Sequence, residues 1–181
     1  MKTILVLLAI VILSQATTAQ KYISKNGHIW FFASTPLEDI EAHNNQVVSI
    51  LNVADGTLQF SLLVKAFEFK KALMQEHFNE NYMESDKIPK SSFTGKITNN
   101  DQIDYKKDGA YPAEVTGELT IHGVTKSVPA KGTIIVSGKS ITAKAKFIAM
   151  PKDYDIEIPS VVENKIAKEV EVNVDVTYNQ Y

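Results

Sequence analysis

The chain has 181 residues, of which 44% are hydrophobic and 22% charged, an ordinary composition for a globular protein with a substantial core. Its 19 basic residues are all lysine and nearly balance 21 acidic residues, so there is no basic excess of the kind that binds nucleic acid. The absence of cysteine excludes disulfides, thiolate nucleophiles and iron–sulfur clusters.

The first 19 residues have the three-part layout of a secretory signal peptide. Lys2 supplies a positive charge, residues 4–13 are an unbroken apolar run, and Ala19 ends a stretch of small residues that suits cleavage. This apolar run is too short to span a bilayer, which takes about 20 residues. We therefore expect residues 1–19 to be removed, leaving one periplasmic or secreted domain over residues 20–181 with no transmembrane segment and no lipoprotein cysteine.

Alternation of apolar and polar residues predicts β-strands over most of the remaining chain, most clearly between Val170 and Tyr178. Turn signals such as Asp55-Gly56 separate the alternating segments and favour hairpins between sequence neighbours. The predicted strands cover residues 28–34, 46–53, 57–68, 92–103, 110–122, 124–136, 140–149 and 167–179.

Three segments depart from this alternation. Residues 69–87 are rich in helix formers and carry an apolar stripe at helical spacing, so we expect a helix that ends before Pro89. The stripe consists of Leu73, Met74, His77, Phe78 and Tyr82. Residues 35–43 and 151–166 are predicted to be irregular, the first with a helical turn.

Eight long antiparallel strands with one or two short helices predict an all-β fold that closes into an eight-stranded barrel, because closure removes exposed sheet edges. The interior of such a barrel is either packed solid or wide enough for one small ligand. Strands of about 12 residues, each rising about 3.3 Å, reach roughly 40 Å. A tall, narrow, apolar lumen of this kind suits a linear chain.

Three segments resemble the YceI-like family. Residues 73–95 (LMQEHFNENYMESDKIPKSSFTG) resemble its helix-to-strand segment, residues 117–126 (GELTIHGVTK) its central hairpin, and residues 153–159 (DYDIEIP) the connection before its last strand. The resemblance covers essentially all of residues 20–181 and is closest to short, stand-alone Bacteroidetes-type forms. It implies an exported, lipocalin-like antiparallel barrel that binds a polyisoprenoid or another amphiphilic lipid. Members often dimerise, so a homodimer is one expected assembly.

The more apolar face of each strand should line the lumen, and the helix is a candidate lid over one mouth. These criteria predict a ligand-binding lumen lined by Trp30, Phe32, Phe60, Leu62, Phe78, Tyr82, Phe93, Ile97, Leu119, Ile121, Ile134, Phe147, Val172 and Val174. Residues 28–32 are apolar on both faces, so one face there needs a cover. Inward apolar residues of a small barrel can also form a plain core, and that alternative stays open.

Polar residues give no positive case for an enzyme, because no phosphate loop, GxSxG or HExxH motif is present. His77 and Glu80 could serve as metal ligands or acid–base groups, but a solvated acidic helix face is the simpler interpretation. His122 precedes Gly123 and is predicted to hold a tight turn, because histidine tolerates positive φ. His28 and His43 have no partner pattern in the sequence.

The sequence therefore favours an exported binding protein, not an enzyme, without cofactor or metal. It would hold an isoprenoid, quinone-like or fatty-acid-like ligand for transport, storage or sequestration. The alternative is a packed, ligand-free barrel that acts through its surface as an interaction or stress-response module. An enzyme that uses His77 on a lipid substrate is a third hypothesis.

Overall fold

The computed structural model describes residues 21–34, 39–158 and 167–180. The predicted signal peptide and parts of the two predicted irregular segments lie outside the described residues. The strands are β1 (Lys21–Ser34), β2 (Asp39–Asn52), β3 (Thr57–Leu63), β4 (Glu68–Phe69), β5 (Lys90–Ile97), β6 (Gly109–Ile121), β7 (Val124–Ser137), β8 (Ser140–Ala149) and β9 (Val170–Gln180). The helical elements are η1 (Val64–Ala66), α1 (Ala72–His77), the π-helical turn η2 (Phe78–Tyr82), η3 (Asn100–Gln102) and η4 (Pro151–Tyr154).

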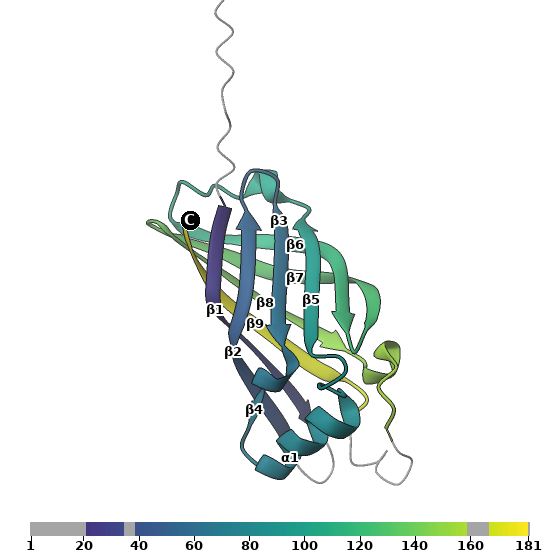
Figure 1. The fold of residues 1–181 in the computed structure, drawn as a ribbon. Coiled ribbons are helices and arrows are strands. Elements are labelled where there is room, and N and C mark those ends of the chain that lie inside the picture. The colour runs from purple at the N-terminus through teal and green to yellow at the C-terminus, as the bar shows by residue number, and fades with distance from the viewer. Residues whose placement is uncertain (1–20, 35–38, 159–166, 181) are drawn as a thin grey trace, which may run out of the picture.

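The long strands form one antiparallel sheet that closes into a barrel (Figure 1). The order around the barrel is β1-β9-β8-β7-β6-β5-β3-β2, and pairing between β1 and β2 completes the circle. The two-residue β4 pairs with β2 alone. The predicted closed barrel of eight long strands is confirmed, and β4 is an addition that the sequence pattern did not indicate.

β2 begins earlier than predicted, so the irregular segment and helical turn expected over residues 35–43 are wrong from residue 39 onward. Ile40 and Ala42 pair with Ala33 and Phe31 of β1, and Ala42 is fully buried. The alternation of inward and outward side chains along β2 continues through these residues. β3 is shorter than the strand predicted over residues 57–68. It ends at Leu63, because residues 64–66 form the helical turn η1.

The predicted helix over residues 69–87 is correct in type but too long. α1 and η2 cover residues 72–82, and the amide of Met83 closes the last turn on the carbonyl of Phe78. Glu84 then adopts a φ of 42°, which a right-handed helix does not accommodate. Among the described residues, no helix is long and apolar enough to cross a membrane.

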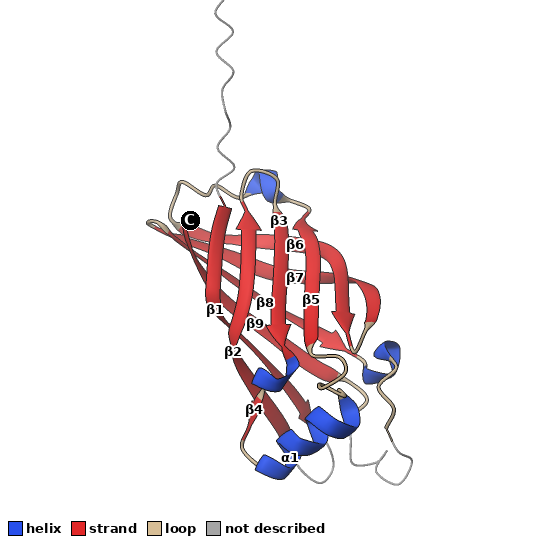
Figure 2. Ribbon diagram, viewed as in Figure 1, coloured by secondary structure: helices blue, strands red, loops and turns tan. Residues whose placement is uncertain are grey.

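The two ends of the barrel are built differently. A buried core that includes Tyr22, Leu51 and Tyr178 fills the end where β1 begins and β9 finishes. The Tyr178 hydroxyl lies 2.7 Å from Ser49 Oγ, and Ser49 donates to the Gln59 carbonyl at 2.9 Å, so the buried hydroxyls are satisfied. α1 lies at the opposite end, together with most of the helical turns (Figure 2).

Candidate functional site: an apolar cavity in the barrel

The barrel contains a cavity of about 480 Å³ between the filled end and α1. All eight long strands contribute to its wall, and α1, η2 and η4 border it at the α1 end. Most of the lining side chains are aliphatic or aromatic because each strand turns its apolar face inward. The volume falls within the range of about 300–1,000 Å³ that is typical of small-ligand sites.

Most of the predicted lumen residues do line this cavity. They are Phe60, Leu62, Phe78, Tyr82, Phe93, Leu119, Ile121, Ile134, Phe147, Val172 and Val174. They come from β3, η2, β5, β6, β7, β8 and β9, and the closed sheet brings them together.

The prediction that they line the lumen is wrong for three residues, Trp30, Phe32 and Ile97. On β1 the inward face is the one that carries Ile29, Phe31 and Ala33, so Trp30 and Phe32 lie on the outer face. Both faces of residues 28–32 are apolar, and the sequence pattern could not choose between them. Ile97 is 1% exposed, but it belongs to the core that fills the opposite end of the barrel.

The open space comes from small residues that the sequence reasoning did not single out. On β7 and β8, the residues that face the cavity include Ala130, Gly132, Ala143, Ala145 and Ala149. A Cβ at Gly132 would collide with the backbone oxygen of Lys144, so the two strands approach closely there. The available signal was the alanine repeat at one parity of β8, which leaves space that larger side chains would fill.

Four phenylalanines pack the helical segment against the barrel. Phe78 of η2 contacts Phe31 of β1, Phe69 of β4 and Phe67, and the ring centroids within this set are 5.0 to 5.8 Å apart. Offset and edge-to-face rings at these distances stabilise each other beyond their buried area. The helix therefore lies over the cavity at the place where the sequence predicted a lid.

Polar groups are sparse in the cavity wall. No Asp or Glu is among the described residues that line it. Ser61, Ser91, Ser92 and Thr133 supply hydroxyls, and His77 and Lys144 also border the cavity. Burial raises the pKa of the Tyr82 and Tyr154 phenols, so both stay protonated and neutral. In the described part of the chain, no group of three or more His, Asp or Glu is placed to hold a metal ion.

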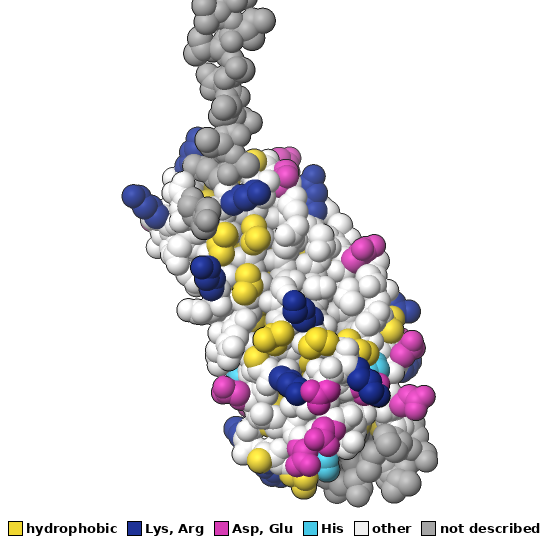
Figure 3. All heavy atoms as spheres, viewed as in Figure 1, with side chains coloured by type: hydrophobic (Ala, Val, Ile, Leu, Met, Phe, Trp, Pro, Cys, Tyr) yellow, Lys and Arg dark blue, Asp and Glu magenta, His cyan; other side chains and the backbone are white. Residues whose placement is uncertain are grey.

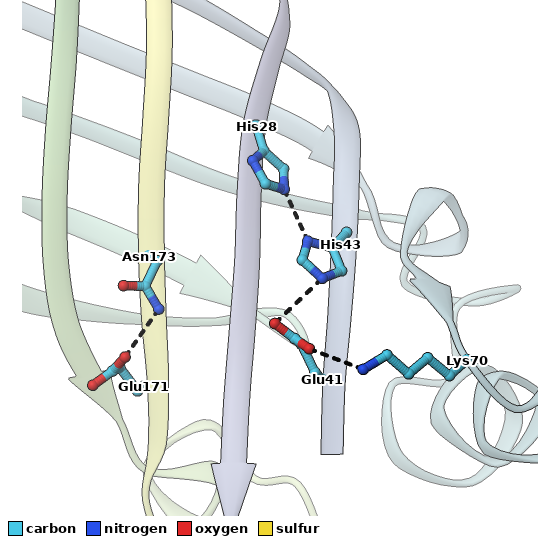
Figure 4. A network of polar contacts seen from close by, with 6 residues as sticks. All are labelled: His28, Glu41, His43, Lys70, Glu171 and Asn173. Carbon is cyan, nitrogen blue, oxygen red and sulfur yellow. Dashed lines mark hydrogen bonds and ion pairs between the residues drawn. The ribbon is translucent and has the colours of Figure 1, made fainter. Parts of the chain in front are cut away.

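His28 and His43 form a polar network on the outside of the barrel (Figure 4). His28 Nε2 lies 3.0 Å from His43 Nδ1, and His43 Nε2 lies 3.4 Å from Glu41, which Lys70 approaches to 3.5 Å. The Trp30 ring stacks on His28 at 4.6 Å. Neither histidine has a partner pattern in the sequence, because it is the pairing of β1 with β2 that brings them together.

Charged side chains of both signs are mixed over the face of the barrel in Figure 3. Lys144 pairs with Asp175 and Lys146 with Glu171, each at 2.8 Å, on the outer side of β8 and β9. This mixture agrees with the nearly balanced composition of the chain.

Several solved structures share this fold. A polyisoprenoid-binding domain from Saccharophagus degradans, implicated in plant cell wall breakdown, is 12% identical with a TM-score of 0.77, over 90% of this chain and 99% of that one. BcnA of Burkholderia cenocepacia is 15% identical with a TM-score of 0.70, over 83% of this chain and 95% of that one. The YCEI protein of Campylobacter jejuni is 17% identical with a TM-score of 0.57, over 75% and 81%.

No curated protein sequence gives a match. The model of the YceI-like domain matches residues 22–178, which span every strand of the barrel. The family resemblance carried by residues 73–95, 117–126 and 153–159 is therefore confirmed, and the chain belongs to the YceI-like family.

Proposed function

We propose that this protein carries or stores a long apolar ligand of the isoprenoid, quinone or fatty-acid class inside its barrel. The apolar cavity of about 480 Å³ is the observation that carries the proposal. Each CH₂ group moved from water into such a cavity contributes about 0.8 kcal/mol before the cost of ordering the chain. The polyisoprenoid binding attributed to the S. degradans domain supports the isoprenoid member of this class.

The proposal includes export and an absence of catalysis. Export is supported by the charged start, apolar run and small-residue stretch of residues 1–19. N-terminal sequencing of the protein recovered from the periplasm or medium of its host should begin at Gln20. An intact Met1 on the recovered protein would contradict the export proposal.

Native mass spectrometry tests the cargo directly. The protein is purified without detergent from its own host, and bound lipid is extracted and identified. We expect a stoichiometric adduct that extracts as a prenyl or fatty chain. A bare protein that stays bare after incubation with quinones, prenols and fatty acids would contradict the carrier function and favour the packed-barrel interaction module.

A matched pair of substitutions on β7 tests the location of the ligand. Ala130→Phe adds a ring inside the cavity, whereas Lys131→Phe adds the same ring on the neighbouring exposed position. We expect Ala130→Phe to weaken binding of a fluorescent fatty acid by at least about tenfold, or about 1.4 kcal/mol, because it occupies ligand volume. Lys131→Phe should bind like the wild type. Equal affinities in equilibrium titrations, with both variants folded, would place the ligand elsewhere.

A further inference from the structure

Three residues with unusual backbone conformations occur at the α1 end of the barrel. Glu84, His122 and Asp155 are the non-glycine residues of the described chain with positive φ, at 42°, 50° and 52°. Such conformations are disfavoured for residues with a Cβ and persist only where surrounding contacts hold them. These three lie in separate segments: the turn after η2, the β6–β7 hairpin and the end of η4.

The His122 side chain joins these three segments. Its Nδ1 lies 3.2 Å from the backbone carbonyl of Tyr154, and its Nε2 lies 3.5 Å from the Glu84 carboxylate. The His122 side chain is 12% exposed, so the imidazole is shielded from water, whereas Glu84 is 38% exposed and partly solvated. The Lys87 ammonium donates a hydrogen bond to the Glu84 carboxylate. One imidazole therefore bridges segments separated by more than 30 positions in the sequence.

The junction is incompletely hydrogen-bonded. Asn79 Oδ1, Ser85 Oγ and His122 Nε2 are the buried side-chain atoms that lack a hydrogen-bond partner among the described residues. All three belong to η2, to the turn after it or to His122 itself. The Nε2–Glu84 separation also exceeds the usual N–H···O distance of about 2.9 Å. These contacts are weak enough to open without disrupting the barrel.

Each of the three residues directly follows a residue that lines the cavity: Met83, Ile121 and Tyr154. The backbone of the junction thus determines where these three side chains lie at the α1 end of the cavity. The opposite end is filled by Tyr22, Leu51 and Tyr178, which favours the α1 end as the route for ligand exchange.

We propose that His122 is a positioning residue that latches these three segments together and sets the rate at which ligand enters and leaves the cavity. The inference rests on the proposed function. His122 is not itself among the described residues that line the cavity, so we expect its contacts to contribute equally to the empty and the filled protein. Loss of the latch should therefore speed association and dissociation by a similar factor and leave Kd nearly unchanged.

Two substitutions of His122 distinguish the contribution of its side-chain contacts from that of the backbone conformation of its turn. His122→Gly tolerates positive φ but removes both contacts, whereas His122→Asn tolerates positive φ and keeps an amide donor for the Tyr154 carbonyl. In stopped-flow exchange of a fluorescent fatty acid, we expect His122→Gly to raise both rate constants about tenfold. His122→Asn should fall between this variant and the wild type. His43→Ala, on the outer face, should exchange like the wild type. Unchanged rate constants in His122→Gly, or a change in only one of the two rate constants that therefore alters Kd, would overturn the latch.

A second measurement needs no ligand. Amide hydrogen exchange of the empty protein should show faster exchange over residues 83–87 and 121–124 in His122→Gly, with partial recovery in His122→Asn. Unchanged exchange in both segments would overturn the latch even if the probe binds. If no probe binds the wild type but these segments respond, the proposed function fails, and with it the control of ligand exchange, whereas the role of His122 in holding the three segments together stands.

Discussion

His28 is a titratable residue of the outer face whose surroundings change its ionisation. Burial, reinforced by the neighbouring His43, lowers the pKa of His28 below its ordinary value of 6.5. The unfolded chain therefore binds a proton more readily than the folded protein. By linkage, stability is retained above pH 6.5 and is lost as the pH falls through the lowered pKa of the folded state.

Removing this imidazole should reduce the loss of stability in acid. We expect the melting temperature of the wild type to fall between pH 8 and pH 5, and the fall to be smaller in His28→Asn. His77→Asn, at an exposed histidine of α1, is the matched control and should behave like the wild type. An identical pH dependence in His28→Asn would show that His28 does not contribute to the acid sensitivity.

At the scale of elements, the helix depends on the aromatic cluster rather than on its own length. α1 has six residues, fewer than an isolated helix needs in water, so packing must hold it in place. Phe78→Ala removes the ring that contacts Phe31, Phe67 and Phe69. We expect a loss of about 1.5–3 kcal/mol in the free energy of unfolding.

Chemical denaturation measures this loss, and Leu73→Ala is the control on the same helix. Leu73 is 61% exposed, so its truncation should change the unfolding free energy little. If Phe78→Ala costs no more than Leu73→Ala, the cluster does not fasten the helix. Faster fatty-acid exchange in Phe78→Ala alone would support the role of this helix as a lid.

At the scale of the whole molecule, one end of the barrel is a filled core and the other encloses space. Leu51 is fully buried in the filled end, whereas Leu62 faces the cavity. Leu51→Ala should therefore cost about 2–5 kcal/mol, because it leaves a new void in a packed core. Leu62→Ala enlarges a space that already exists and should cost less.

Denaturation of the two variants, with and without fatty acid, checks this division. Leu51→Ala should be the less stable of the two in the absence of ligand, whereas Leu62→Ala should lose more of the stabilisation that ligand confers on the folded state. Equal losses in the empty protein would mean that the barrel is packed uniformly along its length.

Alternation in the sequence was sufficient to predict most strands and their inward residues. At Phe60, Leu119 and Val172 one face of the strand is distinctly more apolar, so the direction of the side chain follows from the pattern. Trp30 and Phe32 were misplaced because β1 is apolar on both faces over residues 28–32. Ile97 faces inward as predicted, but position along the barrel axis puts it in the filled core.

The class of fold, the family and the apolar character of the interior are predictable from the chain alone, because these depend on local period, turn residues and motif order. The closed barrel settles which face of β1 points inward, that Ala130 and Ala145 leave the lumen open, and that Glu84, His122 and Tyr154 meet at its end. These features depend on closure of the barrel, which sets the register between strands and brings together residues that are remote in the sequence.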